Sequence, residues 1–136
     1  FGHMPAGMAA LLVAAVRKAQ TATTFDFGFA LGPRINAAGR LADMTIGIEC
    51  LLTDDATQAR ELAAILHGIN DERRALQADM QDVADMRLDG IDATHAACMF
   101  HPDWHPGVVG LVASKLKERL HRPAVAFAPA EPDGDM

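Results

Sequence analysis

The fold class is decided by residues 96–128, which read AACMFHPDWHPGVVGLVASKLKERLHRPAVAFA. Residues 96–100 form an apolar run with the length of a buried strand, and residues 124–128 form a second such run. Between them, residues 107–120 carry apolar side chains at helical spacing that are expected to face inward: Val108, Leu111, Val112, Leu116 and Leu120. Strand, helix and strand over about thirty residues predict a βαβ unit with a right-handed crossover. The fold is therefore expected to be α/β.

A long helix is expected before this unit, over residues 53–90 and helical to about residue 87. Thr53 is its expected N-cap, and Asp54 and Asp55 place negative charge in the first turn. Asp89-Gly90 ends it. Its apolar residues recur at three- and four-residue steps and make one stripe: Leu62, Ile65, Leu66, Ile69, Leu76, Met80 and Val83. A helix of this length connects two bodies or wraps around one.

The first fifty residues are expected to be mostly helical. Alanine and leucine favour a helix over residues 6–20, and a short apolar helix is expected over residues 45–52. Residues 21–32 are broken by Thr, Asp and Gly, and they carry three phenylalanines: Phe25, Phe27 and Phe29. A break between helices is therefore predicted there.

The composition limits the classes of function. Half of the 136 residues are hydrophobic, which suits a packed core, and 18 acidic against 12 basic residues give a net charge of −6. That balance argues against nucleic-acid binding over the whole surface but leaves room for a local basic groove. Cys50 and Cys98 form no C-x-x-C pair, so neither a disulfide framework nor a zinc site is indicated. No apolar run approaches the ~20 residues of a membrane span. Residues 1–4 are interpreted as a cloning scar, and no signal peptide is recognised. The two cysteines suit a reducing compartment, and a cytoplasmic location is expected.

The first motif is LGPRINAAGRL, residues 31–41, which is expected to form a loop. Its polar side chains are two arginines and an asparagine, set among residues that let a ligand approach the backbone: Arg34, Asn36 and Arg40. Guanidinium groups match phosphate oxygens and stay charged, and the asparagine can donate to phosphate or orient an arginine. The alternative is structural, with both arginines pairing with acids such as Asp26 or Asp43.

The second motif is FHPDWHPGVVG, residues 100–110, where the first strand turns into the following helix. The amides at a helix N-terminus favour anions, so Trp104 could stack on a base and His105 could bind a phosphate. The alternative is that Trp104 fills the core while His101 and His105 are satisfied loop histidines. The His-x-x-x-His spacing suggests a metal only weakly, because prolines interrupt it and a third ligand is missing.

A third motif, NDERR at residues 70–74, lies within the long helix. Mixed charges of this kind are mostly solvated pairs, but Arg73 falls on the apolar stripe and is expected to reach a buried acid or a phosphate. Ser114 and Lys115 are expected to be ordinary solvated residues. The sequence contains no Asp-x-Asp pair beside a strand, no Asp-His-His triplet and no phosphate-binding Gly-rich loop. No catalytic or metal-ligating residue is therefore predicted in this chain.

Three ordered stretches together resemble the RecJ family of DHH phosphoesterases. Residues 29–41 resemble the signature that ends the DHH domain, and residues 70–74 resemble an N-x-x-R-[RK] segment on the helix that links the two domains. Residues 101–116 are similar to the opening of the DHH-associated domain. The resemblance implies the C-terminal part of a DHH domain at 1–52, a connector helix at 53–90 and the N-terminal part of the DHH-associated domain at 91–136.

By this resemblance, the intact enzyme removes nucleotides from single-stranded DNA in the 5′→3′ direction during recombination and repair, and uses manganese or magnesium. The chain matches an internal part without the Asp-His-His cluster, so it is expected to bind no cofactor and to be inactive alone. The implied nucleic-acid-binding residues are Arg34, Asn36, Arg40, Trp104 and His105. Two alternatives remain: a DHH-family phosphodiesterase of oligonucleotides or cyclic dinucleotides, and a non-catalytic interaction module.

The expected partners are single-stranded DNA, bound weakly, and a second copy of the chain; no membrane is expected. Exposed apolar helices and open strand edges favour a homodimer. The apolar stripe would then be buried against another chain, or against the first helix folded back upon it. A compact monomer is the alternative.

Overall fold

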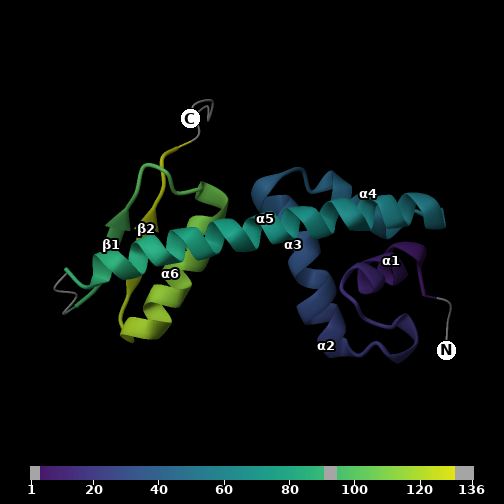
Figure 1. The fold of residues 1–136 in the computed structure, drawn as a ribbon, viewed down its shortest axis with the longest axis horizontal. Helices are drawn as coiled ribbons and strands as arrows, with labels where there is room; N and C mark the ends of the chain where they lie inside the picture. Colours follow the sequence, from purple (N-terminus) through teal and green to yellow (C-terminus); the bar gives the residue numbers. More distant parts are fainter. Residues whose placement is uncertain (1–3, 91–94, 131–136) are drawn as a thin grey trace. The chain divides into compact units, whose positions relative to one another are not determined.

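The computed structural model describes residues 4–90 and 95–130, and it divides the chain into two compact units. Unit 1 is Phe1–Arg73 and unit 2 is Arg74–Met136, so the helix α5, Ala56–Leu88, contributes residues to both (Figure 1). None of the helices in the described ranges is long and apolar enough to cross a membrane. The assignment of residues 1–52, 53–90 and 91–136 to parts of two named domains stays a prediction.

Unit 1 begins with helix α1, Ala6–Ala14, which is shorter than the helix expected over residues 6–20. It ends because Val16 adopts a left-handed conformation, with φ of 57°. The amide of Val16 then donates to the carbonyl of Val13 at 2.9 Å, and the amide of Arg17 donates to the carbonyl of Leu12 at 2.8 Å. This pair of bonds is a Schellman cap, which is normally formed by glycine. A short 3₁₀ turn, Ala19–Thr21, follows.

The break expected over residues 21–32 is wrong, because the chain is helical from Thr24 onward. Helix α2, Thr24–Asp26, runs into a π-helical turn η2, Phe27–Leu31, and then into helix α3, Gly32–Leu41. Thr23 and Asp26 form a capping box at the start, with the Thr23 amide donating to Asp26 Oδ2 at 2.9 Å. Pro33 lies in the first turn of α3, where its missing N–H is tolerated.

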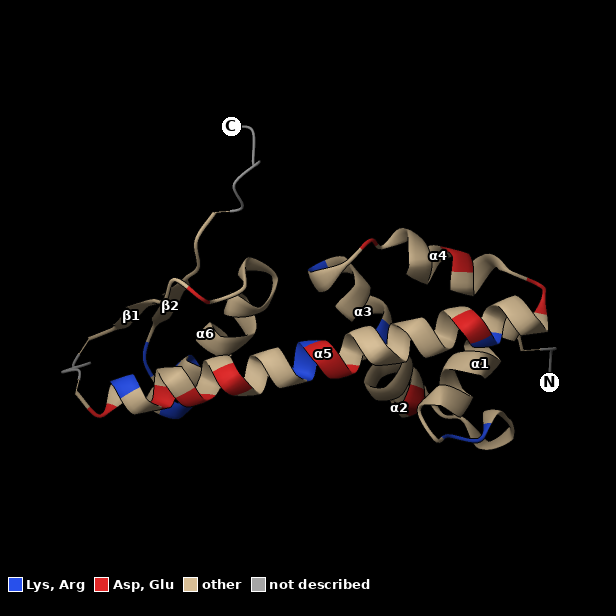
Figure 2. Ribbon diagram, turned by 45° about the horizontal axis from the view of Figure 1, so that its top comes forward, with Lys and Arg blue, Asp and Glu red and all other residues tan. Residues whose placement is uncertain are grey.

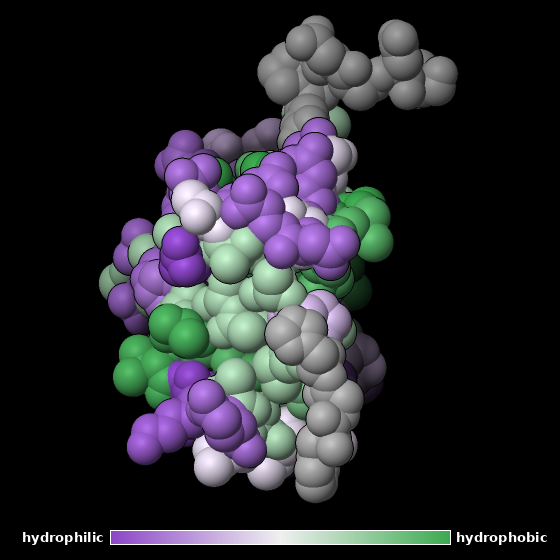
Figure 3. Space-filling view, turned by 90° about the vertical axis from the view of Figure 1, so that its right-hand side faces the viewer, coloured by the Kyte–Doolittle hydropathy of each residue, from purple (hydrophilic) through white to green (hydrophobic). Residues whose placement is uncertain are grey.

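The expected short helix is confirmed as α4, Thr45–Leu52, and it packs against α1 at backbone distance. Gly7 of α1 is buried, and a Cβ atom placed on it would overlap the carbonyl oxygen of Cys50. The core of unit 1 joins α1, η2, α3, α4 and the first half of α5, and its fully buried members include Leu11, Leu12, Ala38, Cys50, Ala59 and Leu66. Burial raises the pKa of the Cys50 thiol. An apolar hollow of about 210 Å³ lies between α1 and the start of α5, on a side where small apolar side chains gather (Figure 3).

Helix α5 confirms the long helix expected over residues 53–90, but its N-cap is Asp55 and not Thr53. Asp55 Oδ1 accepts from the amides of Thr57 at 2.7 Å and Gln58 at 3.1 Å. Thr53 instead ends α4, and its hydroxyl accepts from the Asp55 amide at 3.2 Å. The helix therefore begins after Asp55 and not after Thr53, because the side chain of Asp55 accepts from amides in the first turn of α5, as an N-cap residue does.

The apolar stripe of α5 is confirmed only in part. Leu66 and Met80 are buried, whereas Ile65 is 49% exposed and lies off the buried face. Small or polar residues take the other closely packed positions of the helix: Ala59, Ala63, Asn70 and Ala84. Leu66 and the half-buried Leu62 belong to one core cluster that contains residues of α1, η2, α3 and α4, so this part of the stripe packs within unit 1. The homodimer stays a prediction.

Unit 2 confirms the α/β fold class. Strand β1, Ala97–Phe100, helix α6, Pro106–Leu120, and strand β2, Ala124–Phe127, form a βαβ unit. The two strands pair in parallel, with Ala97 opposite Ala124 and Phe100 opposite Phe127. Three of the residues expected to face inward from α6 are fully buried: Val108, Val112 and Leu116. Ser114 and Lys115 are exposed, as expected for solvated residues.

The capping carboxylates predict how stability depends on pH. The pKa of Asp55 is lowered by the amides of Gln58 and Thr57, and the pKa values of Asp26 and Asp43 are lowered by their bonds to Thr23 and Thr45. A carboxyl group whose pKa is lower in the folded state stabilises the fold above its unfolded pKa, and this contribution is lost as pH falls through the folded pKa. We therefore expect these carboxylates to make the melting temperature fall below about pH 4.

The Asp55→Asn variant tests the contribution of the α5 cap, because asparagine caps helices without titrating. The variant should keep most of the neutral melting temperature and should lose less of it between about pH 5 and pH 2 than the wild-type chain. Thermal unfolding followed by circular dichroism measures both. Identical acid profiles for the two proteins would show that Asp55 does not carry this dependence.

Candidate nucleic-acid interface

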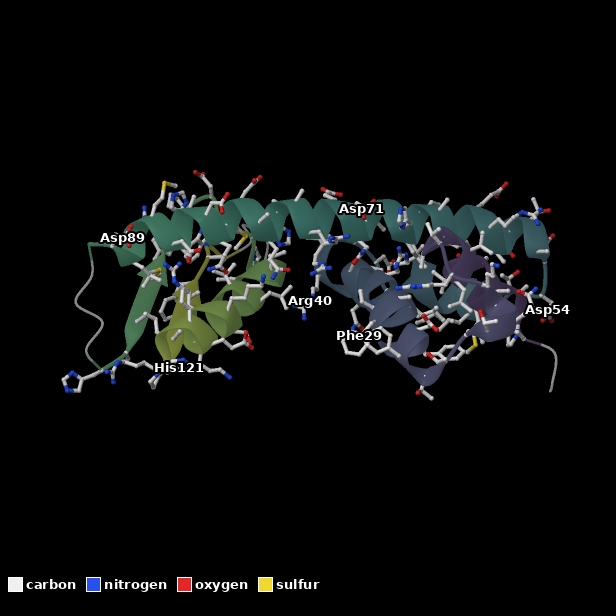
Figure 4. The ribbon with its side chains drawn as sticks, turned by 60° about the horizontal axis from the view of Figure 1, so that its bottom comes forward. Phe29, Arg40, Asp54, Asp71, Asp89 and His121 are labelled. Carbon is white, nitrogen blue, oxygen red and sulfur yellow. The ribbon has the colours of Figure 1, made fainter. Side chains whose placement is uncertain are left out.

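The three polar residues of the first motif lie on helix α3 and not on a loop, so the expectation of a loop is corrected. Proline and the two glycines suggested a loop, but Pro33 is accommodated in the first turn and Gly39 is helical. Asn36 and Arg40 are one helical turn apart, so they share one exposed face. Arg34 lies on another face and is half-buried. The helix therefore brings two of the three predicted residues together, with Arg40 near its C-terminal end (Figure 4).

Arg34 contacts acceptors on different elements of unit 1. Its Nε and Nη2 atoms lie 3.2 and 3.0 Å from Nδ1 of His67 on α5, and its Nη1 atom donates to the carbonyl of Ala30 at 2.7 Å. The acids named in the structural alternative have contacts of their own. Asp26 caps α2 and pairs with Arg17 at 3.5 Å, and Asp43 accepts from the amide of Thr45 at 2.9 Å.

His67 is the residue that sequence reasoning missed. It lies 33 positions from Arg34, and its Nε2 atom is 3.3 Å from Asp71 Oδ2 on the next turn of α5. The available signal was its place on the long helix, four residues before Asp71 and next to the NDERR motif. Nothing local in the sequence indicates the contact to α3.

Arg73 of the third motif bonds to a buried amide. Its Nη2 atom donates to Asn70 Oδ1 at 3.0 Å, and Asn70 is only 3% exposed. The expected contact of Arg73 with a buried acid or a phosphate stays a prediction. Figure 2 shows acidic and basic residues interspersed along α5. This pattern offers local cationic positions and not a continuous basic face.

The second motif, residues 100–110, lies in unit 2. Its side chains have the contacts expected if Trp104 fills the core and the histidines bond within the turn. Trp104 is 3% exposed, and its Nε1 atom has no hydrogen-bond partner among the described residues. His105 is the N-cap of α6, and its Nδ1 atom accepts from the amide of Gly107 at 3.0 Å. His101 stacks on Trp104 with ring centroids 6.0 Å apart and lies 3.8 Å from Asp103 Oδ2. Contacts of Trp104 and His105 with DNA stay predictions, and base stacking would require the indole ring to become exposed.

A hollow of about 240 Å³ adjoins Trp104 within unit 2. Its walls come from α5 and from the turn that follows β1: Leu76, Asp79, Met80, Val83, His101, Asp103 and Trp104. The two carboxylates disfavour a phosphate there. Across the part of the chain that the structure describes, no three His, Cys, Asp or Glu side chains come together to hold a metal ion.

These features define an α/β protein in which a long helix carries residues of a helical unit and of a parallel βαβ unit, with an arginine-bearing helix packed on its first half. No family model matches the chain. It is 47% identical over 134 residues to the single-stranded-DNA-specific exonuclease RecJ of Dickeya dadantii, and 46% identical to that of Escherichia coli. Each match covers 95% of this chain and 23% of the relative.

Solved structures agree with the sequence comparison. The crystal structure of Thermus thermophilus RecJ in complex with Mg²⁺ superposes with a TM-score of 0.77 at 34% identity, covering 90% of this chain and 19% of that one. A crystal structure of exonuclease RecJ bound to manganese gives 0.78 at 34% identity, covering 92% and 31%. By sequence and fold, this chain is thus a relative of the RecJ exonucleases along nearly its whole length. It spans about a quarter of the length of the curated relatives.

Proposed function

We propose that this chain is the DNA-backbone-contacting segment of a RecJ-type, metal-dependent 5′→3′ single-stranded-DNA exonuclease that acts in recombination and repair. The observation that carries the proposal is the similarity to RecJ over 95% of the chain at 47% identity. Manganese or magnesium would serve the intact enzyme and would be held outside the described residues. A cytoplasmic location belongs to the same proposal, and two free cysteines, Cys50 and Cys98, support it.

The backbone contacts are assigned to α3. Asn36 and Arg40 share an exposed face, and Arg34 is a guanidinium whose orientation is already set by its neighbours. Guanidinium groups bind phosphate oxygens through paired N–H donors. Because few phosphates would be contacted and the net charge is −6, binding by the isolated chain should be weak and sensitive to salt.

Substitution of Arg40 tests this assignment. The Arg40→Ala variant should bind a 5′-phosphorylated single-stranded oligonucleotide about 5- to 10-fold more weakly at low salt, because one charge-assisted contact is worth roughly 1–1.5 kcal/mol. Arg60→Ala, an exposed arginine in the first turns of α5, is the control and should bind like the wild-type chain. Fluorescence anisotropy measures the affinities. Equal affinities for Arg40→Ala and the wild-type chain would remove Arg40 from the interface.

The proposal also predicts that the 136-residue chain does not shorten single-stranded DNA, with or without added manganese. Two-metal hydrolysis needs carboxylate or histidine ligands placed around both ions, and the sequence carries no Asp-His-His triplet. The products of a labelled single strand, separated on a denaturing gel, measure this. Manganese-dependent shortening by a preparation free of host nucleases would contradict the assignment.

A second candidate function is an interaction module. Phe25 and Phe29 stack with ring centroids 4.4 Å apart while remaining 59% and 71% exposed, which is unusual for a surface without a partner. If the chain binds single-stranded DNA and substitution of Arg34 and Arg40 abolishes that binding, the first proposal is favoured. A chain that binds no DNA at low salt favours the module.

A further inference from the structure

The imidazole of His67 connects an arginine of α3 with an aspartate of α5. Arg34 Nε and Nη2 are 3.2 and 3.0 Å from His67 Nδ1, and His67 Nε2 is 3.3 Å from Asp71 Oδ2. All three residues belong to unit 1. Asp71 lies on α5 (Figure 4), and its side chain is 55% exposed while that of His67 is 40% exposed. The chain of contacts therefore begins near solvent and ends at the half-buried arginine.

The contacts of His67 distinguish between the two tautomers of its neutral ring. A guanidinium group has N–H donors and no acceptor, so the Nδ1 atom that faces it must carry a lone pair. The proton of the neutral ring then lies on Nε2, where it can be donated to the carboxylate of Asp71. In either the other tautomer or the imidazolium, an Nδ1–H would face the N–H groups of Arg34. One tautomer alone satisfies both neighbours.

Arg34 is also held from a second direction. Its Nη1 atom donates to the carbonyl of Ala30, which belongs to the π-helical turn η2. Two acceptors at the Nε side and at Nη1 fix the plane of the guanidinium as well as its position. Because Nε and Nη2 face His67, a phosphate would have to approach along the Nη1–Nη2 edge of the guanidinium, and a guanidinium fixed in this way loses less conformational freedom on meeting it than a mobile side chain would.

We infer that His67 is a positioning residue for phosphate binding: its Nε2–H tautomer, oriented by Asp71, holds the guanidinium of Arg34 ready for the DNA backbone. The inference rests on the proposed function, because it assigns Arg34 to the phosphate site. His67 itself touches no DNA in this account. Its effect on affinity passes entirely through Arg34.

Two substitutions of His67 separate positioning from simple packing. His67→Asn places an amide oxygen close to where Nδ1 stands and keeps an acceptor for Arg34, whereas His67→Leu keeps the bulk and removes the acceptor. Ala64→Leu adds the same side chain at an exposed position of α5 and is the matched control. The probe is a 3′-labelled, 5′-phosphorylated oligothymidine, and melting temperatures establish that each variant is folded.

His67→Leu is expected to weaken binding about 3- to 10-fold, as Arg34→Ala does, since both remove one oriented charge-assisted contact. His67→Asn should recover affinity to within about 2-fold of the wild-type chain, and the Arg34→Ala/His67→Leu double variant should be no weaker than Arg34→Ala alone. A further loss of affinity in the double variant, or no recovery by asparagine, would overturn the inference.

Nitrogen-15 NMR of the imidazole provides a readout that is independent of DNA. Nδ1 of His67 should show the signal of an unprotonated nitrogen and Nε2 that of a protonated one, and Arg34→Ala should shift the Nδ1 signal. A protonated Nδ1 in the wild-type chain would overturn the positioning role even if Arg34 binds DNA. If Arg34→Ala leaves DNA affinity unchanged while the expected tautomer is observed, the assignment of Arg34 to DNA fails, and His67 orients an arginine with no role in binding.

Discussion

Replacing Gly7 by alanine is expected to destabilise the chain by about 3 kcal/mol or more, which is a large part of the stability of a typical domain. The added Cβ would overlap the carbonyl oxygen of Cys50 and lie 2.7 Å from its carbonyl carbon. These are backbone atoms of α4, so no side-chain rotation relieves the clash and the two helices must separate. Their separation would open the core around Leu11 and Cys50, both fully buried.

Gly68→Ala is the matched control for this substitution. Gly68 lies inside α5, where a Cβ atom would meet nothing within 4 Å. Alanine is a better helix former than glycine by about 1 kcal/mol, so this variant should be more stable than the wild-type chain. Chemical denaturation followed by circular dichroism measures both changes. Equal effects of the two substitutions would contradict the close packing of α1 on α4.

Replacing Trp104 by alanine is expected to cost about 3–5 kcal/mol in the stability of unit 2. The indole is 3% exposed, and it is the sole tryptophan of the chain. Trp104→Phe should cost much less, because it keeps an aromatic ring and removes a buried N–H group that has no partner in the part of the chain that the structure describes. The 50%-exposed Phe127 supplies the control, and Phe127→Ala should change stability by about 1 kcal/mol or less.

The same variants distinguish the two interpretations of Trp104. A core residue should show blue-shifted fluorescence that single-stranded DNA does not quench, and its loss should be seen first as reduced stability. If Trp104→Ala were folded and nearly as stable as the wild-type chain but bound DNA poorly, the indole would face the nucleic acid and its burial would not persist in solution.

The sequence allows the regular elements with strong periodicity to be predicted. The βαβ unit and helices α4 and α5 follow from apolar spacing over residues 45–128, because burial of one face governs each of them. Residues 21–41 were misjudged, because Thr, Gly and Pro usually end helices. Here Thr23 and Asp26 cap one, and Pro33 falls in a first turn. Composition alone does not reveal whether such residues lie inside a helix or at its start.

The candidate site could be predicted only as a set of residue types. The motif of residues 31–41 identifies the arginines, but the helical phase that groups Asn36 with Arg40 depends on a helix that the sequence did not indicate. The contact between Arg34 and His67 joins elements 33 residues apart and depends on how α3 packs against α5. Pairings of this kind are set by tertiary structure, so local sequence patterns do not reveal them.

The central claim is that α3 contacts the DNA backbone, and the salt dependence of binding tests it most directly. For single-stranded DNA, the logarithm of the affinity falls with the logarithm of the salt concentration by roughly 0.7 per phosphate contact. We predict that the Arg34→Ala/Arg40→Ala double variant binds oligothymidine more weakly and with a slope reduced by about 1.4 relative to the wild-type chain. An unchanged slope and an unchanged affinity would contradict the claim that these arginines meet phosphates.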